Sequence, residues 1–399
     1  MKTLLFVDDE PMVLQGLQRQ LRSMRAEWDM IFVDSGLKAL AFMAARPVDI
    51  VISDMMMPGM DGEQLLLEVV KRHPQTIRII LSGHSEREAA LRLVGPAHQY
   101  LAKPCAADEL RPAIARALAL RELLENDRLK RLATRIKTLP TLPALQNQLT
   151  AELQQESPSL ERVGEIISRD IGMTAKILQI VNSAFFGLGQ PVSNVTEAAV
   201  YLGLSTIHSL TLSVGIFSQF DPAVSRTFSL EALAQHSWTT AVMARSVARV
   251  EQQDQKMTDQ CFLAGLLHNI GQLILAFKLP DEYAGIIARA GREHLPVCQV
   301  ELDCFGAAHT DVGAFLLALW GLPNPIIEAV AMQHCPARCG AREFSPLIAL
   351  HAADVFAHER TGPSLEAVPP PLDLPYLTSA GFGARIECWR ETCLAAGAA

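Results

Sequence analysis

The stretch VDIVISDMMMPGMDG, residues 48–62, places an apolar run directly before an aspartate. Short runs rich in Val and Ile are typical of strands buried in a parallel sheet. Similar runs occupy residues 3–7, 30–33, 77–81 and 99–102, and amphipathic stretches such as 11–24 and 62–73 lie between them. Strands that alternate with helices in this way predict an α/β domain with a doubly wound parallel sheet, covered on both faces.

Polar side chains stand where these predicted strands end. Asp8 and Asp9 follow the first run, Asp54 the third, Ser82 the fourth and Lys103 the fifth. In a parallel sheet, ligands bind beyond the carboxyl ends of the strands, so we expect these groups to converge. Clustered carboxylates repel one another unless a cation joins them, and hard oxygen ligands suit Mg²⁺. Beside a metal, a hydroxyl and a lysine, one aspartate can attack a phosphoryl donor and form an acyl phosphate.

Residues 1–120 resemble a response regulator receiver domain through Asp8-Asp9, SDMMMPGMDG, LSGH and YLAKP. The resemblance implies a flavodoxin-like fold with strand order 2-1-3-4-5. It also implies that a partner histidine kinase, or a phosphotransfer protein, phosphorylates Asp54. The implied site residues are Asp8, Asp9, Asp54 and the Met56 carbonyl for Mg²⁺, Ser82 and Lys103 for the phosphoryl group, and Tyr100 as the switch aromatic.

The strand pattern ends after Pro104, and residues 106–137 read as a long helix or a pair of helices. Five basic residues lie between Arg128 and Lys137. One interpretation is a solvated helical linker, and the other is a signalling helix that pairs in a homodimer. From Leu139 onward the pattern is helical, with Ser157-Pro158 as an expected helix start. Helices are also expected at 172–186, 193–202, 229–250, 258–270 and 324–334.

Five prolines between residues 361 and 375 predict an extended connection to a short last segment. The expected organisation is therefore a receiver domain at 1–120, a helical linker at 121–138, a helical output domain at 139–360 and a C-terminal segment at 361–399.

Several histidines and acids recur along the helical half, namely His236, His268, His309, His334, Asp311 and Asp354. Imidazoles and carboxylates contributed by separate helices can hold metals inside a helical bundle. In GLLHNIGQL, His268 is followed by Asn269, whose neutral amide oxygen is a weaker ligand than a carboxylate. Cys335 and Cys339 next to His334 form half of a zinc pattern, but no second pair has standard spacing, which favours reduced thiols.

Residues 135–355 resemble an HDOD domain, a regulatory relative of HD-type metal phosphohydrolases. The segments concerned are LPTLPALQNQL, IISRDIGMTAKILQIVNSAFFG, EAAVYLGLSTI, LAGLLHNIGQLIL, HTDVGAFLLALWGLP and LHAADVFA. The resemblance implies an all-α, HD-like domain with a degenerate site at His236, His268, Asn269, His309, His334 and Asp354. Asn269 replaces the aspartate of the HD pair, and Cys335 stands where relatives that cleave cyclic-di-GMP often have a second histidine. We therefore expect weak binding of one transition metal at most.

The composition excludes several function classes. The chain has 399 residues, and 35 basic against 43 acidic residues give a net charge of −8. This charge, and the lack of a basic recognition helix, argue against direct DNA binding. The first ten residues do not form a secretory signal, and polar residues interrupt the apolar stretch 261–277, so we expect no membrane span. Eight irregularly spaced cysteines are typical of reduced thiols in a bacterial cytoplasmic protein.

These features predict a phosphorelay response regulator whose HDOD output domain binds a protein or a ligand. The alternative is a phosphorylation-gated, metal-dependent phosphohydrolase of the HD superfamily.

Overall fold

The structure is a computed structural model that describes residues 1–82, 97–103, 105, 110, 111, 114, 118, 139–155, 157–182, 191–208, 211, 217–219, 228–339, 343–361, 368, 369 and 371–396. The predicted helix at 106–137 lies largely outside these residues. For Ser82 and Tyr100, the structure describes the backbone and not the side chain. Along the chain, the main boundary between two compact units falls between residues 138 and 139.

The first unit is built on a five-stranded parallel sheet. Its strands are β1 (Lys2–Val7), β2 (Trp28–Val33), β3 (Ile50–Asp54), β4 (Ile77–Ser82) and β5 (Gln99–Ala102). Their order is β2-β1-β3-β4-β5, which confirms the predicted topology. In the register, Val7 lies opposite Ser53 and Asp54 lies opposite Leu81, so the carboxyl ends of the central strands are level.

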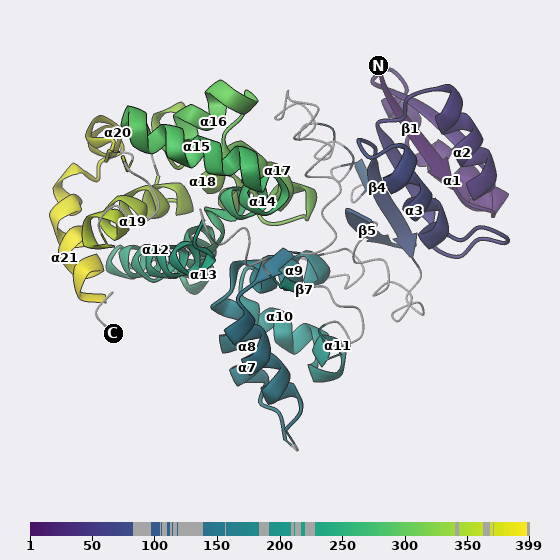
Figure 1. Ribbon diagram of the computed structural model, residues 1–399. Coiled ribbons are helices and arrows are strands. Elements are labelled where there is room, and N and C mark those ends of the chain that lie inside the picture. The colour runs from purple at the N-terminus through teal and green to yellow at the C-terminus, as the bar shows by residue number, and fades with distance from the viewer. Residues whose placement is uncertain are drawn as a thin grey trace. The chain divides into compact units, whose positions relative to one another are not determined.

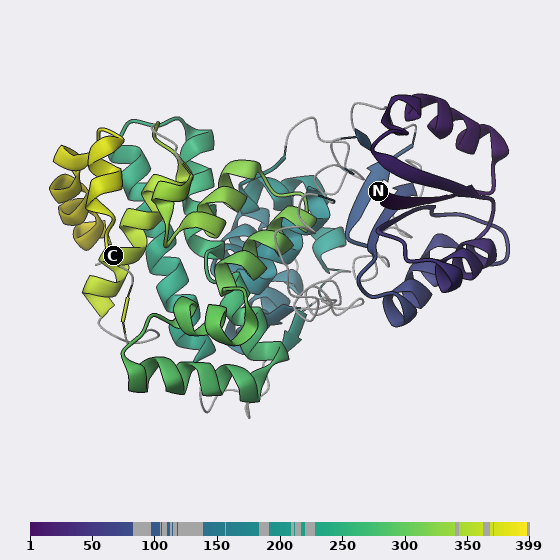
Figure 2. The ribbon, with the colours of Figure 1, turned by 90° about the horizontal axis from the view of Figure 1, so that it is seen from above.

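Helices cover both faces of this sheet. The described elements are α1 (Pro11–Gln20), the short η1 (Arg22–Met24), α2 (Gly36–Ala45) and α3 (Gly62–Arg72). Figure 2 shows α1 on one face of the sheet and α2 and α3 on the other. Every residue of β3 is buried because both of its faces are covered. Such complete burial explains why the sequence shows an unbroken apolar run there rather than an alternating pattern.

The second unit is mainly helical (Figure 1). Its helices are α7 (Pro143–Leu153), α8 (Leu160–Ser168), α9 (Ile171–Val181), α10 (Val195–Leu202), α11 (Leu204–His208), α12 (Leu230–Val250), α13 (Gln255–Leu267), α14 (Ile270–Lys278), α15 (Pro280–Glu293), α16 (Val297–Phe305), α17 (His309–Leu319), α18 (Asn324–Met332), η5 (Pro336–Arg338), α19 (Pro346–Thr361), α20 (Leu374–Ser379), η6 (Gly383–Arg385) and α21 (Ile386–Ala396). The predicted fold class is confirmed, with one addition: β6 (Leu139–Thr141) and β7 (Phe217–Gln219) pair in parallel.

Two local predictions in this unit were wrong in detail. The cap of α8 is Ser159 rather than Ser157, and its hydroxyl accepts a hydrogen bond from the Arg162 backbone N–H at 3.3 Å. The single helix expected at 258–270 is instead the end of α13 and the start of α14. A Cβ on Gly271 would overlap the backbone carbonyl of His309, so the start of α14 lies directly against the start of α17. This close approach brings the His268-Asn269 junction beside His309.

The C-terminal segment completes a core cluster of the helical unit. Trp389 on α21 is fully buried among residues of α12 and α19. Its indole N–H donates to Glu251 at 2.8 Å, and Arg385 pairs with the same carboxylate at 2.7 Å. Residues 372–396 are thus an integral part of the helical core rather than an appendage.

One helical stretch, Gln255–Lys278, is long and apolar enough to cross a membrane by length and composition, and 89% of its most apolar window is buried inside the protein. The bent helix pair Val297–Phe305 and His309–Leu319 passes the same test when its two members are taken together. Buried core helices of soluble proteins also have this composition.

Candidate functional sites

The acidic site of the first unit lies at the carboxyl ends of β1 and β3. Oxygen atoms of Asp8, Asp9 and Asp54 all lie within 4.8 Å of one another. Asp8 and Asp54 are buried, and Asp9 is closer to solvent. The Lys103 ammonium donates to Asp8 at 2.7 Å and forms an ion pair with Asp54. Four of the predicted site residues are therefore brought together.

The backbone around Asp54 depends on a glycine. A Cβ on Gly62 would overlap the Asp54 carbonyl, so only glycine allows α3 to begin so close to the end of β3. Asp61 caps α3 by accepting a hydrogen bond from the Gln64 N–H at 2.8 Å. The residues MPGMDG after the strand thus form the tight connection that holds Asp54 at the sheet edge.

The charges of this site are strongly coupled. Burial raises the pKa of Asp54, against the opposing effect of the Lys103 ammonium. For Lys103, burial would lower the pKa, but its contacts with Asp54 and Asp8 raise it overall. Carboxylate oxygens are the ligands that Mg²⁺ prefers, so Asp8, Asp9 and Asp54 fit a magnesium ion by donor type and spacing.

The remaining predicted receiver residues are described only in part. Ser82 ends β4, and Tyr100 lies in β5, three residues before Lys103 along the chain. Met56 follows β3 by two residues, and 58% of its surface is exposed. The structure therefore leaves the roles of Ser82, Tyr100 and the Met56 carbonyl as predictions.

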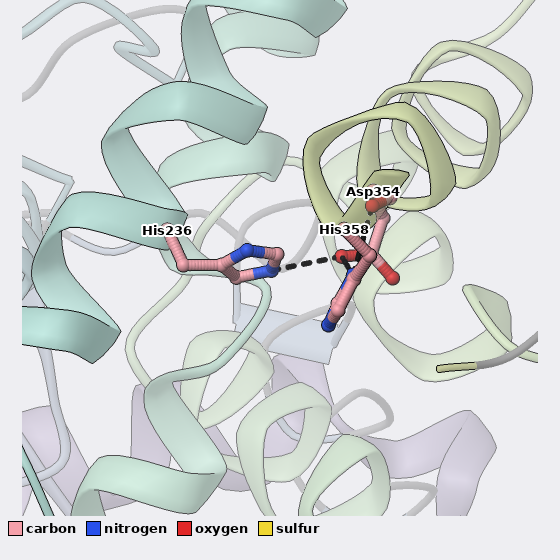
Figure 3. Close-up of side chains that lie close together, drawn as sticks. All are labelled: His236, Asp354 and His358. Carbon is pink, nitrogen blue, oxygen red and sulfur yellow. Dashed lines mark hydrogen bonds and ion pairs between the residues drawn. The ribbon is translucent and has the colours of Figure 1, made fainter. Parts of the chain in front are cut away.

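A second cluster lies inside the helical unit, around Asp354 of α19. The His236 Nε2 atom of α12 lies 3.0 Å from Asp354 Oδ1 (Figure 3). His358 lies one turn after Asp354, and its Nδ1 is 2.9 Å from the Asp354 backbone carbonyl and 3.4 Å from Oδ1. Ligand atoms of His236, Asp354 and His358 all lie within 4.8 Å of one another, which is close enough for one shared metal ion.

The position of His268 favours a cation near Asp354. Its Nδ1 lies 2.6 Å from the Gly265 carbonyl, so this nitrogen carries a proton and donates it to that carbonyl. Its Nε2 lies 3.4 Å from Asp354 Oδ1 and is buried with no hydrogen-bond partner among the described residues. A buried ring nitrogen and a carboxylate oxygen at this distance attract each other when a proton or a metal lies between them.

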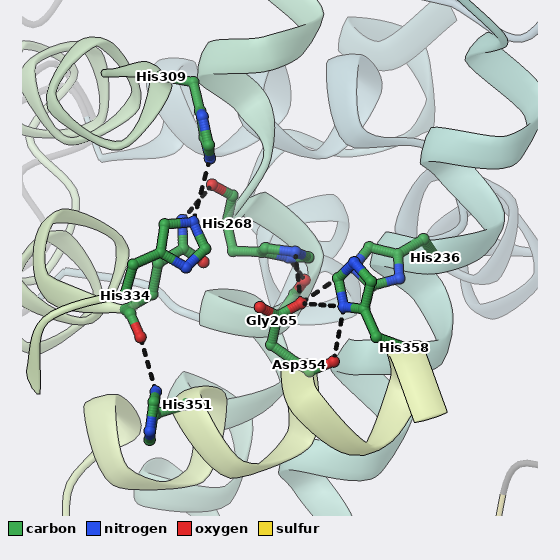
Figure 4. A network of polar contacts seen from close by, with 9 residues as sticks. His236, Gly265, His268, His309, His334, His351, Asp354 and His358 are labelled. Atoms are coloured by element: carbon green, nitrogen blue, oxygen red, sulfur yellow. Dashed lines mark hydrogen bonds and ion pairs between the residues drawn. The ribbon is translucent and has the colours of Figure 1, made fainter. Parts of the chain in front are cut away.

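His309 and His334 extend this network (Figure 4). Their Nε2 atoms are 3.4 Å apart. Glu301 accepts hydrogen bonds from both the backbone N–H and Nδ1 of His309 at 2.7 Å, and from the Tyr283 hydroxyl at 2.7 Å. A carboxylate that binds one nitrogen of a histidine orients the ring and leaves the other nitrogen facing the site.

The acid–base state of the cluster follows from its burial. Burial lowers the pKa of His236 to about 4, although Asp354 opposes this shift. Burial and the neighbouring His309 lower the pKa of half-buried His334 to about 3. For Asp354, burial alone would raise the pKa, but contacts with His236, His268 and His358 lower it well below its ordinary value. A buried anion surrounded by histidines is a plausible environment for one divalent cation.

Among the acids and histidines predicted from the sequence, Asp311 has a capping role: its carboxylate accepts from the Ala308 N–H at 2.8 Å at the start of α17. Asn269 is buried, 6% exposed, at the start of α14, with no side-chain capping bond. Sequence reasoning missed His358 and Glu301. The i, i+4 spacing of Asp354 and His358 was a usable signal for a shared helix face. Nothing local indicated that Glu301 would meet His309.

Comparison with known families divides the chain at the same place. The family model for the response regulator receiver domain matches residues 4–115, and that for the HDOD domain matches residues 139–336. Among solved structures, the MmoQ response regulator of Methylococcus capsulatus has a TM-score of 0.52 and 25% identity, covering 66% of this chain and 99% of that one. A virulence factor of Campylobacter jejuni has a TM-score of 0.51 and 20% identity over 68% and 94% of the two chains, which shows a shared fold alone.

Curated relatives match only part of the chain. A protein of unknown function from Treponema pallidum is 25% identical over 54% of this chain and 41% of its own length. The DNA-binding transcriptional regulator NtrC of Escherichia coli K12 is 30% identical over 41% of this chain and 32% of its own length. The hydrogenase transcriptional regulatory protein HoxA of Cupriavidus necator is 34% identical over 29% of this chain and 24% of its own length. The matched region thus spans less than half the length of each of these relatives.

Proposed function

Because the chain joins a response regulator receiver domain to an HDOD domain, we propose that it is a phosphorelay response regulator in which phosphorylation of Asp54 controls the binding activity of the helical unit. The observation that supports the first half most directly is the convergence of Asp8, Asp9 and Asp54 with Lys103. The phosphoryl donor is a histidine kinase or a phosphotransfer protein.

The chemistry is a displacement at phosphorus. An Asp54 carboxylate oxygen attacks the phosphorus of a phosphohistidine, an O–P bond forms, and the P–N bond breaks. The electron pair of that bond returns to the imidazole nitrogen, which takes up a proton. The Lys103 ammonium lies against both Asp8 and Asp54. It can therefore form an ion pair with the phosphoryl oxygens once the phosphoryl group is bound to Asp54. Mg²⁺ held by Asp8, Asp9 and Asp54 would supply further positive charge to those oxygens. Ser82 and Tyr100 are proposed as the phosphoryl-binding hydroxyl and the switch aromatic.

The test is phosphorylation of the full chain with acetyl phosphate and Mg²⁺. Asp54→Asn preserves the shape but removes the nucleophile, so a hydroxylamine-sensitive phosphoryl group should form on wild type and not on the variant. Asp61→Asn is a matched control, because Asp61 caps α3 outside the acidic cluster. Equal labelling of wild type and Asp54→Asn would place the acceptor elsewhere and contradict the proposal.

For the helical unit, we favour a binding output over a hydrolase. A two-metal centre has four positive charges, and Asp354 is the single carboxylate among the predicted ligands of this cluster. The predicted ligands and His358 fit one cation and do not fit two. The protein should therefore contain no more than one transition metal per chain in this unit and should not hydrolyse cyclic-di-GMP or a generic phosphodiester. Two tightly bound metals together with turnover would instead support the phosphohydrolase alternative.

We also propose the domain limits predicted from the sequence, with one modification. The receiver domain extends over residues 1–120 and a helical linker over 121–138, and the output domain begins at 139. Because α21 packs into the core with α12 and α19, we include the described residues up to 396 in the output domain. The proposed location is the bacterial cytoplasm, and the proposed output acts without direct contact to DNA or a membrane.

A further inference from the structure

A cavity of about 840 Å³ lies in the helical unit along α12. It is lined by α7, the end of α8, one face of α12 and the end of α19. The volume is within the range of small-molecule sites, about 300–1,000 Å³. His236 also belongs to α12 but does not line the cavity, so this site is distinct from the histidine cluster.

The lining is strongly basic in a chain whose net charge is −8. Three arginines, Arg169, Arg245 and Arg360, contribute to the wall, against one acidic residue, Glu231. Among the residues that the structure describes, none of these guanidinium groups has an ion-pair partner within 4 Å. Like charges repel, so three unpaired guanidinium groups around one cavity favour an anionic ligand.

Arg245 is held in place for such a ligand. Its guanidinium lies over the Phe262 ring, 4.8 Å from the centroid, and its Nε atom is buried with no hydrogen-bond partner in the described part of the chain. Burial and the nearby Arg249 lower the pKa of Arg245. Because the side chain is already oriented by the ring, little conformational entropy is lost when it binds an anion.

The same ring supports an aromatic surface beside the arginines. Trp238 meets Phe262 edge-on at 5.6 Å between centroids, and Trp238 is itself half-buried in the cavity wall. An indole face can stack on a nucleobase, and such stacking tolerates any of the bases. Gln148, Gln235 and Thr239 add hydrogen-bonding groups to the wall.

We propose that this cavity binds a nucleotide, with its phosphates against Arg169, Arg245 and Arg360 and its base on Trp238. The inference deepens the proposed output function, on which it rests, by naming the class of ligand. It requires both features together: the arginines account for the phosphates, and the tryptophan accounts for the ring that inorganic phosphate lacks.

The experiment is calorimetric titration of the full chain with ATP, GTP and cyclic-di-GMP, and with inorganic phosphate as the ring-free probe. At least one nucleotide should bind more tightly than phosphate. Arg245→Gln should weaken that nucleotide about tenfold or more, because charged hydrogen bonds are worth about 1.5–3 kcal/mol. Trp238→Phe should weaken the nucleotide while leaving the affinity for phosphate unchanged.

Two matched variants distinguish this site from general charge or folding effects. Arg249→Gln removes an exposed arginine from the same helix outside the cavity, so it should leave binding unchanged. Glu231→Gln removes the acidic wall residue and should strengthen binding, a gain that misfolding cannot produce. Equal losses for Arg245→Gln and Arg249→Gln would overturn the proposed site.

Failure of the nucleotide inference is distinguishable from failure of the proposed function. If no nucleotide binds while Asp54 is still phosphorylated, the nucleotide site is overturned and the response regulator proposal stands. Tighter binding of a polyglutamate peptide than of any nucleotide would assign the cavity to an acidic protein segment and would also overturn the inference.

Discussion

Asp170 provides a sharp test of how the helical unit is held together. Its side chain is 2% exposed between α8 and α9. One carboxylate oxygen accepts from the Leu142 N–H at 2.8 Å, and the other accepts from the Met173 N–H at 2.8 Å. A Cβ on Gly172 would overlap the Pro140 carbonyl, so the backbone of β6 crosses α9 closely here. A single carboxylate therefore ties the start of α7 to the start of α9.

Asp170→Ala should destabilise this unit by about 3–5 kcal/mol. Each hydrogen bond to a charged group contributes about 1.5–3 kcal/mol, and the substitution leaves two N–H groups without their acceptor. Asp170→Asn keeps one acceptor oxygen but directs an amide N–H₂ at the second donor. The free energy of unfolding should therefore fall by less, about 2 kcal/mol. Asp281→Ala, an exposed acid in the first turn of α15, is the control and should cost less than about 1 kcal/mol.

The assay is urea unfolding of the full chain followed by tryptophan fluorescence. In a Trp28→Phe background, the three remaining tryptophans, Trp238, Trp320 and Trp389, all follow residue 139, so they report on the helical half of the chain. If Asp170→Ala lowers the free energy of unfolding by less than about 1 kcal/mol, water or rearranged backbone replaces both hydrogen bonds of the carboxylate. That result would refute the reasoning.

The remaining predictions concern charge. Lys103→Ala should slow phosphorylation of Asp54 by acetyl phosphate, since the variant loses the cation that contacts both Asp8 and Asp54, and an unchanged rate would remove Lys103 from the proposed chemistry. Asn269→Asp should raise metal content in elemental analysis, and His358→Ala should lower it, whereas equal metal in both would argue that the cluster is purely structural. Burial lowers the pKa of Lys176 to about 7, below about 10.4 in an unfolded chain. The unfolded chain then binds more protons between these pH values, so the free energy of unfolding should rise with pH there, and Lys176→Met should flatten that rise in urea titrations.

Much of the receiver unit was predictable because its decisive signals are local. The apolar runs that end at Asp8, Asp54 and Ser82 reflect strands buried on both faces, and the strand order and fold class agree with the structure. Since parallel strands end at the same edge, spacing alone indicated that Asp8, Asp9, Asp54 and Lys103 would converge.

In the helical unit, periodicity and residue types indicated helices and a set of histidines, but the packing of the helices decides which of these histidines meet. The resemblance to an HDOD domain implied a site that includes His236, His268 and Asp354, but it did not reveal His358 as their neighbour or Glu301 as the partner of His309. The cavity around Arg245 also depends on the third dimension, because α8, α12 and α19 are far apart along the chain. Helical periodicity specifies which face of a helix is apolar, but the partner of that face is set by how close the backbones approach, as at Gly265 and Gly271. That approach is a property of the whole packed unit, which no single segment encodes.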